Sequence, residues 1–376
     1  MTRSLRLANA TVLTPEGALE RGDVHVADGA IVDAFGAADV IDCAGLTVLP
    51  GVVDVHGDAF EGALHPRPGV AIPFEVAMRS VDAQLIANGI TTAFHGLTLS
   101  WEPGARSLDA GRRFMSGLAA LRPALAADHR VQLRWETFAH EALEDIVGWL
   151  GGVPTPTLAL NDHTTMTRDI IRSGRHAKLQ KYAIRCRVTL DEYIALNEAA
   201  LERESDVPAK IAEVAEMARA AGATMLSHDD RTAEERRAGR ALGVGIAEFP
   251  LTREAATEAR GAGEHTVLGG PNALRGGSHM GALSAEEAVR EGLCTILASD
   301  YYYPSQFAAV ERLVKRGVVD FPAGWSLISA APAEAMGLTD RGAIAPGRRA
   351  DLVVVERGDP WRIRHVATGG VVSSFA

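Results

Sequence analysis

The spacing of apolar and polar residues changes after the first fifty or so positions. Up to that point apolar residues alternate with polar ones in short runs, separated by turn residues such as Asp28-Gly29. Alternation with a period of two is typical of strands, so this part predicts a small antiparallel sheet. Two stretches near the other end, 342–355 and 366–375, have the same β-rich character. We therefore expect both ends, residues 1–50 and 340–376, to form one small β-domain.

Between these ends a different unit recurs: a short apolar run ending in polar residues, followed by a stretch with helical periodicity. Such runs occur at 51–58, 91–97, 131–137, 157–163, 223–230, 244–250, 265–271 and 295–301. Repeated strand–helix alternation on this scale is typical of a (β/α)8 TIM barrel, an α/β fold that we predict for residues 51–339. A doubly wound open sheet is the alternative. The long Arg-rich connection at 166–206 predicts a helical insertion, a lid or a substrate-facing segment.

Composition and charge narrow the class of protein. The 376 residues are 47% apolar and 23% charged, as in globular proteins. A net charge of −10, from 38 basic and 48 acidic residues, argues against nucleic acid or an anionic membrane surface as the main partner. The three cysteines Cys43, Cys186 and Cys294 indicate a reducing compartment rather than a disulfide framework. Without a secretory leader or a long apolar run, the sequence predicts a cytoplasmic protein, which we expect to be a homo-oligomer.

Ionisable residues gather where the apolar runs end. The carboxyl ends of barrel strands meet at one rim, where active sites form. The first run ends in His56 and Asp58, which share a face because they are two positions apart on a strand. Later runs end in Glu136, Asp162, His163, His228 and Asp300. Several imidazoles and carboxylates on one rim are costly without a cation, so the sequence predicts a divalent metal site.

Each of these residues also has a plain structural interpretation. A single strand-end histidine is more often a hydrogen-bonded structural group than a ligand. The joint occurrence on five runs is what favours a metal. His95, which ends the second run, is expected to be structural or to lie behind the ligands. Asp229 and Asp230, next to His228, are expected to orient imidazole ligands.

Three segments resemble the amidohydrolase superfamily: 49–58 (LPGVVDVHGD), 227–230 (SHDD) and 342–354 (GAIAPGRRADLVV). Five more are similar to one branch of it, which hydrolyses α-D-ribose 1-methylphosphonate 5-triphosphate in the carbon–phosphorus lyase pathway. These are 66–68 (PRP), 248–250 (EFP), 269–272 (GGPN), 275–279 (RGGSH) and 299–302 (SDYY). The superfamily resemblance implies a barrel flanked by a β-sandwich and one or two divalent metal ions, with zinc favoured and manganese or iron compatible.

The resemblance also assigns metal ligands. The family's ligands correspond to His56, Asp58, His163, His228 and Asp300, and the last is also the expected catalytic base. One departure is Asp58, because the commoner first motif of the superfamily is His-x-His. A second is the bridging group, which in many relatives is a carboxylated lysine. The lysines here, Lys178, Lys181, Lys210 and Lys315, lie in predicted helices or connections. Glu136 is therefore our candidate for the bridging ligand.

The loop after the seventh run, 269–281, predicts a phosphate or phosphonate site. Its glycines let backbone amides approach an anion, and Arg275 and His279 supply further donors. An ordinary glycine-rich turn is the alternative. We predict substrate contacts for Arg67, Asn272, Arg275, Ser278 and His279. Lys178 and Lys181 could neutralise more of a polyphosphate, although a solvated helix face is the more usual explanation.

These observations predict a metal-dependent hydrolase whose substrate is a small phosphorylated sugar. The bound cation would lower the pKa of water, the resulting hydroxide would attack an electrophilic phosphorus, and Asp300 would accept the proton. In the branch that the sequence resembles, attack on the α-phosphorus of the triphosphate releases pyrophosphate. Hydrolysis of an amide, a cyclic amide or an N-acetyl group is the first alternative. A non-catalytic scaffold of the same fold is the second.

Overall fold

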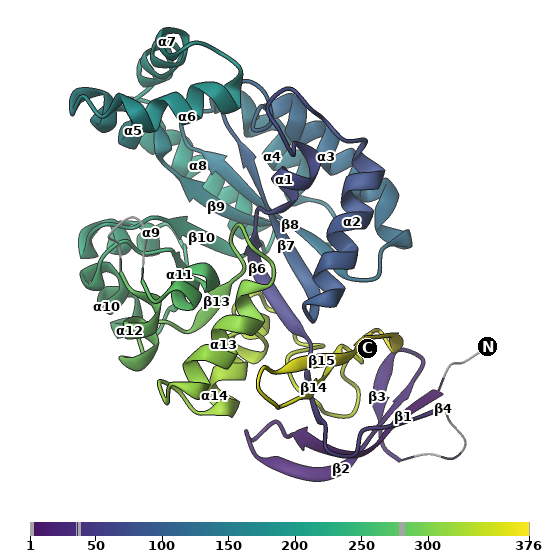
Figure 1. Ribbon diagram of the computed structural model, residues 1–376. Helices are drawn as coiled ribbons and strands as arrows, with labels where there is room; N and C mark the ends of the chain where they lie inside the picture. Colours follow the sequence, from purple (N-terminus) through teal and green to yellow (C-terminus); the bar gives the residue numbers. More distant parts are fainter. Residues whose placement is uncertain (1–3, 35, 37–38, 278–282, 376) are drawn as a thin grey trace.

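Figure 1 shows the computed structural model, which describes residues 4–34, 36, 39–277 and 283–375. Its strands form two separate sheets of eight strands each. The larger body is a parallel barrel surrounded by helices, and the smaller is a mixed sheet at the other end of the molecule (Figure 1). The fold predicted from the sequence is thereby confirmed, while the domain bounds of 1–50, 51–339 and 340–376 stay predictions.

The barrel strands follow one another in sequence order around the sheet. They are β6 (Val52–Gly57), β7 (Ile90–Leu99), β8 (Asp128–Glu136), β9 (Thr157–Asn161), β10 (Met225–His228), β11 (Ile246–Glu248), β12 (His265–Gly269) and β13 (Ile296–Ala298). One strand lies in each of the eight predicted runs. A bridge between Gly57 and Asp300 joins the first and last strands, and the Asp300 amide donates to the His56 carbonyl at 2.9 Å. This closure distinguishes the fold from a doubly wound open sheet.

Helices connect the strands and cover the outside of the barrel (Figure 1). Thr232 and Thr252 accept hydrogen bonds from backbone amides three residues ahead and so cap two of these helices. Apolar helix faces pack against the outer faces of the strands in one large core. The helices are α1 (Phe60–Leu64), α2 (Phe74–Ala87), α3 (Leu108–Leu121), α4 (Leu143–Leu150), α8 (Val207–Ala220), α9 (Ala233–Ala241), α10 (Arg253–Gly261), α11 (Gly270–Arg275), α12 (Ala285–Arg290), α13 (Ser305–Lys315), α14 (Phe321–Ser326) and α15 (Ala330–Ala335), with 3-10 turns at Arg122–Ala124 and His140–Ala142.

The long connection after β9 contains three helices before α8 begins: α5 (His163–Arg172), α6 (His176–Cys186) and α7 (Leu190–Leu201). Its first helix is capped by Asp162, whose side chain accepts from the Thr165 amide. The three helices share a small apolar core of their own, in which Leu179 and Ala183 are fully buried. The helical insertion expected near 166–206 is therefore a packed unit rather than a loose loop.

Both ends of the chain build the second sheet, in the order β16-β15-β14-β5-β1-β2-β3 with β4 paired to β1. The strands are β1 (Ser4–Leu13), β2 (Leu19–Ala27), β3 (Ala30–Val32), β4 (Asp39–Asp42), β5 (Thr47–Pro50), β14 (Leu352–Glu356), β15 (Arg362–Thr368) and β16 (Val371–Ser374). The prediction of a purely antiparallel sheet was wrong, because β1 pairs in parallel with both β4 and β5. Period-two alternation sets which face is buried and leaves strand direction open.

Among the described residues, none of the helices is both long and apolar enough to cross a bilayer. All three cysteines are buried and unpaired. The expected cytoplasmic location and homo-oligomeric state stay predictions.

Candidate metal centre and active site

A cleft of about 660 Å³ opens at the carboxyl ends of the barrel strands. The strand ends form its floor, and the helical insertion forms one wall. Among the described residues, six cationic side chains line it, namely Arg106, Arg134, Lys178, Lys181, Arg185 and Arg275. The predicted ligands His56, Asp58, Glu136, His163, His228 and Asp300 line it as well. Residues separated by more than two hundred positions thus meet at one rim, as parallel strands of a barrel require.

The first group of potential ligands is His56, Asp58 and Asp300, which have ligand atoms within 4.8 Å of one another. Asp300 has a φ of 57°, an unusual conformation for a non-glycine residue. Its backbone is held by hydrogen bonds with His56 and Asp58, each 2.9 Å long. Burial, together with the nearby Asp58 carboxylate, raises the pKa of Asp300 to about 6. An oxygen with this pKa is a stronger base than an ordinary carboxylate and is still largely ionised at neutral pH.

The second group is His163, His228 and Asp229, whose ligand atoms also lie within 4.8 Å of one another. His163 is the first residue of α5, and His228 is the last residue of β10. An oxygen of Asp229 lies 3.8 Å from Nε2 of each imidazole. Asp229 therefore lies beside both imidazoles, where it could orient them or bind the same ion. A third group, His56, His228 and Glu248, joins the first two, and the rings of His56 and His228 stack at 5.6 Å.

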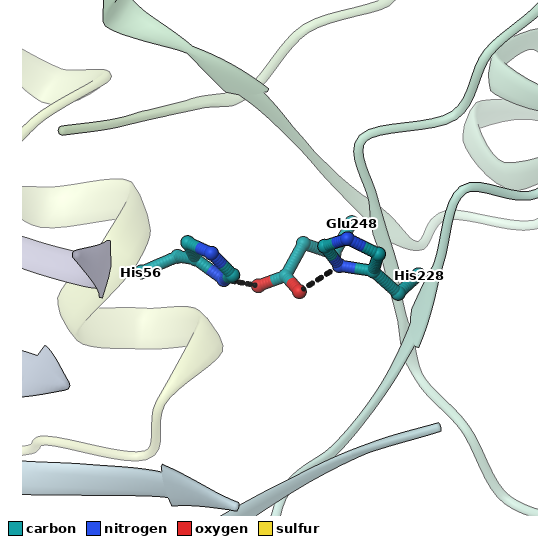
Figure 2. Close-up of side chains that lie close together, drawn as sticks. All are labelled: His56, His228 and Glu248. Carbon is teal, nitrogen blue, oxygen red and sulfur yellow. Dashed lines mark hydrogen bonds and ion pairs between the residues drawn. The ribbon is translucent and has the colours of Figure 1, made fainter. Parts of the chain in front are cut away.

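Glu248 is a residue of this centre that the sequence analysis missed. Its fully buried carboxylate lies 3.0 Å from Nδ1 of His56 and 2.8 Å from Nδ1 of His228, as Figure 2 shows. Gln132 donates a further hydrogen bond to it at 2.6 Å. Burial alone would raise the pKa of Glu248, but the two imidazoles outweigh burial and lower it strongly. Glu248 is not among the described residues that line the cleft, so it lies behind the imidazoles.

The position of Glu248 in the sequence could have revealed it. It lies near the end of the sixth predicted run, just as His228 lies near the end of the fifth, and the sequence analysis named it only as part of a motif. The rule that polar residues ending barrel strands face one rim applies to it equally.

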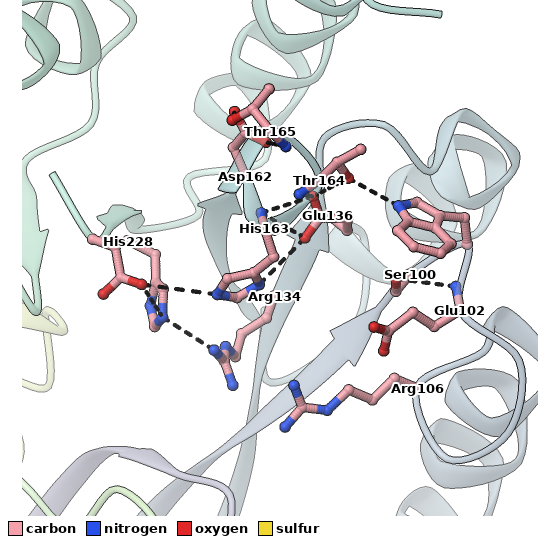
Figure 3. Close-up of polar contacts among 12 residues, drawn as sticks. Ser100, Glu102, Arg106, Arg134, Glu136, Asp162, His163, Thr164, Thr165 and His228 are labelled. Atoms are coloured by element: carbon pink, nitrogen blue, oxygen red, sulfur yellow. Dashed lines mark hydrogen bonds and ion pairs between the residues drawn. The ribbon is translucent and has the colours of Figure 1, made fainter. Parts of the chain in front are cut away.

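Arg134 is a second residue that the sequence analysis missed. Its Nη2 lies 3.1 Å from Nε2 of His228, and its Nη1 lies 3.5 Å from the Asp58 carboxylate. The guanidinium therefore contacts one member of each ligand group, and Figure 3 shows its contact with His228. On β8 it alternates with Gln132 and Glu136, a period-two polar pattern that indicates an inward face.

Gly96 on the neighbouring strand gives this arrangement its space. A Cβ atom at that position would lie 3.0 Å from Cδ of Arg134 and 3.4 Å from Nε2 of His56. Only a residue without a side chain lets both groups pack over β7.

Glu136 makes contacts that differ from those of a simple bridging ligand. Its carboxylate accepts hydrogen bonds from the His163 and Thr164 amides at 3.0 and 3.1 Å, and from the Thr164 hydroxyl at 2.7 Å (Figure 3). It also lies 3.3 Å from Nδ1 of His163. Glu136 thus stabilises the start of α5 and orients His163, while its bridging of two metal ions stays a prediction.

The residues predicted to lie behind the metal ligands and orient them are found in different places. Asp230 binds Ser227 at 2.5 Å and Arg236 at 3.2 Å, so its contacts are with these residues rather than with an imidazole. His95 pairs with His129 at 2.8 Å, and His129 in turn lies 3.0 Å from Asp82. This buried chain is separate from the described lining of the cleft, which makes His95 a structural residue of the outer layer.

The predicted substrate-binding residues differ in where they lie relative to the cleft. Arg275 and Asn272 line the cleft, and the Asn272 side chain also joins its loop to Leu283 and Ala285. Arg67 is exposed and is not among the described lining residues. Its predicted role therefore has no support from the shape of the cleft. Ser278 and His279 lie outside the described residues.

The chemistry of the two ligand groups fits divalent metal ions. Each group combines imidazole with carboxylate, and the buried Glu248 holds two imidazoles by Nδ1 in the manner typical of metal-binding histidines. Such mixed nitrogen and oxygen donors suit zinc, manganese and iron alike. His56, Asp58 and Asp300 would hold one ion, and His163, His228 and Asp229 a second.

Comparisons with known proteins agree with this geometry. No family model matches the sequence. The chain is 31% identical over 365 residues to the α-D-ribose 1-methylphosphonate 5-triphosphate diphosphatase of Escherichia coli (strain K12), with 94% of this chain and 96% of that protein covered.

Solved structures show the same fold at low identity. A protein described as an amidohydrolase has a TM-score of 0.63 and 15% identity, with 99% of each chain covered. Molinate hydrolase has a TM-score of 0.68 and 14% identity, with 99% of this chain and 95% of the other covered. A β-aspartyl dipeptidase from Fervidobacterium islandicum AW-1 has a TM-score of 0.63 and 16% identity, with 100% and 97% covered.

Proposed function

This chain belongs to the α-D-ribose 1-methylphosphonate 5-triphosphate diphosphatase family of the amidohydrolase superfamily, and from this we propose that it hydrolyses that triphosphate to the 5-phosphate and pyrophosphate. One structural observation supports the proposal most. Among the described residues, the cleft that gathers both ligand groups is lined by six cationic and five anionic side chains, and the cationic Lys178 and Lys181 have no carboxylate partner there, in a chain whose net charge is −10. An uncharged amide substrate would need no such concentration of positive charge, and a scaffold would need no complete ligand set.

In this proposal Asp300 is the general base. Attack by water on the α-phosphorus forms one P–O bond and breaks the bond to the oxygen that bridges to the β-phosphorus, so pyrophosphate leaves. An Asp300 carboxylate oxygen takes the proton of the attacking water. A divalent ion bound at the ligand groups would supply a Lewis acid and lower the pKa of that water. We favour zinc, with manganese or iron compatible with the same donors.

Arg134 is placed to stabilise the charge that builds up on the phosphoryl oxygens. Its guanidinium is almost fully buried and is fixed between Asp58 and His228. A fixed, buried donor of this kind stabilises a transition state without having to reorganise during the reaction. The space that Gly96 leaves, and the inward-facing polar positions of β8, set the position of Arg134.

Pyrophosphate release from purified protein with the ribose triphosphate tests the proposal, with Asp300→Asn as the variant. Because a positioned general base contributes roughly 10²–10⁴-fold, kcat should fall by about that factor. Asp320→Asn is the matched control, because Asp320 caps α14 outside the described lining of the cleft and asparagine caps helices as well. No pyrophosphate from the wild type, or an Asp300→Asn variant as active as the control, would defeat this function.

A further inference from the structure

Helix α6 has two chemically different faces. Leu179, Ala183 and Cys186 point into the small apolar core of the insertion and are buried. Lys178, Lys181 and Arg185 line the cleft instead. Because these positions are three to seven residues apart, the basic side chains form one stripe along the helix. A packed core thus fixes a row of cations above the catalytic floor.

The lysines of this stripe differ from the other two lysines of the chain. Lys210 forms an ion pair with Glu213 at 2.8 Å, and Lys315 pairs with Glu311 at 2.6 Å. Among the described residues, no carboxylate lies within ion-pairing distance of Lys178 or Lys181. In a protein with ten more acidic than basic side chains, two unpaired ammonium groups in a cleft indicate an anionic ligand.

Arg185 gives the stripe a fixed end. Its Nη2 donates to the buried Glu102 carboxylate at 2.5 and 2.8 Å, and the Tyr193 hydroxyl donates to the same carboxylate at 2.7 Å. Since Glu102 already neutralises Arg185, the free charge of α6 is that of the two lysines. Each lysine ammonium is a compact positive charge, and two of them together suit a phosphate chain that carries several negative charges.

We propose that Lys178 and Lys181 bind the two terminal phosphoryl groups of the substrate, which leave as pyrophosphate. This inference rests on the proposed function and adds residues to it. Charge complementarity decides which end of the substrate lies under α6. A methylphosphonate ester has one ionisable oxygen, whereas the two terminal phosphoryl groups together carry about three negative charges near neutral pH, given a second phosphate pKa near 6. The wall with unpaired positive charge therefore takes the polyphosphate end.

The test measures binding of inorganic pyrophosphate to the metal-loaded full-length protein by calorimetry, without turnover. We expect Lys178→Gln/Lys181→Gln to raise the dissociation constant by roughly tenfold or more, equivalent to about 1.4 kcal/mol. Lys178→Arg/Lys181→Arg, which keeps both charges, should restore most of the affinity. Lys210→Gln, the same change at a paired lysine remote from the cleft, should leave it unchanged. Thermal unfolding confirms that each variant is folded.

The results separate this inference from the proposed reaction. Unchanged pyrophosphate affinity in the double glutamine variant would overturn the inference, even if the wild type hydrolyses the triphosphate. A loss of methylphosphonate affinity in place of pyrophosphate affinity would overturn it too, because the substrate would then lie the other way round. Lysine-dependent pyrophosphate binding without triphosphate turnover would support this binding site and refute the proposed reaction.

Discussion

Replacing Glu248 by glutamine tests whether the buried carboxylate organises the metal centre. The substitution keeps the shape of the side chain and removes its charge. One oxygen of Glu248 presently makes an ion-pair contact with Nδ1 of His56 at 3.0 Å, and the other is hydrogen-bonded to Nδ1 of His228 at 2.8 Å. A glutamine has one carbonyl oxygen and one NH2 group, so one imidazole N–H would face a donor. That imidazole must either turn, which moves its Nε2, or change tautomer, which puts the proton on Nε2; in both cases Nε2 can no longer bind the metal ion.

The expected effect is large because one carboxylate serves two imidazoles. Loss of an outer partner of a metal-binding histidine typically weakens metal binding roughly 10–100-fold, or about 1.4 to 2.7 kcal/mol. We expect the upper part of that range here. The carboxylate is fully buried, so solvent cannot replace the lost contact. His56 belongs to one ligand group and His228 to the other, so affinity should fall in both.

Metal affinity is best measured by titrating chelator-stripped protein with zinc or manganese against a competing chelator. Glu286→Gln is the matched control, because Glu286 is also buried and bound by arginines, including Arg290 and Arg316, but is not among the described residues lining the cleft. Folding of both variants is checked by circular dichroism. A Glu248→Gln protein that is folded and binds metal as tightly as the wild type would refute the reasoning. So would an equal loss in the control.

Two further changes test the surroundings of the site. Gly96→Ala would push a Cβ against Arg134 and His56, so we expect kcat to fall at least tenfold and the free energy of unfolding to fall by about 1–3 kcal/mol. Gly245→Ala, with open space at its Cβ, should change neither, and equal kinetics of the two variants would contradict the packing argument. Asp82→Asn should lower the free energy of unfolding at pH 7 by about 1.5–3 kcal/mol, because Asp82 accepts from His129 and two backbone amides. Burial raises the pKa of Asp82, but those hydrogen bonds outweigh it and lower the pKa, so the stabilisation is present above the usual carboxyl value of 3.8 and is lost as the pH falls further. Chemical denaturation from pH 7 down to 3 measures this, and a variant that loses stability in acid as steeply as the wild type would contradict it.

The sequence by itself determined the barrel and the membership of its rim. Strand and helix periodicities are local properties, and eight repeats of them leave few alternatives to a closed barrel. A polar residue at the carboxyl end of a parallel strand must face the same rim as its counterparts, wherever it lies in the chain. This is why His56, Asp58, His163, His228 and Asp300 could be selected as a group.

The tertiary structure decided how those residues divide and what holds them. Glu248 reaches Gln132 across 116 positions, and Arg134 reaches His228 across 94. Such contacts depend on how the closed barrel brings non-adjacent strands together, and no local spacing encodes them. The same holds for α6, whose lysines are an ordinary exposed stripe in the sequence and line the cleft only because the insertion packs over the rim. Local pattern thus fixes which end of each strand a side chain occupies, whereas distance and partner arise only from the packing of the whole chain.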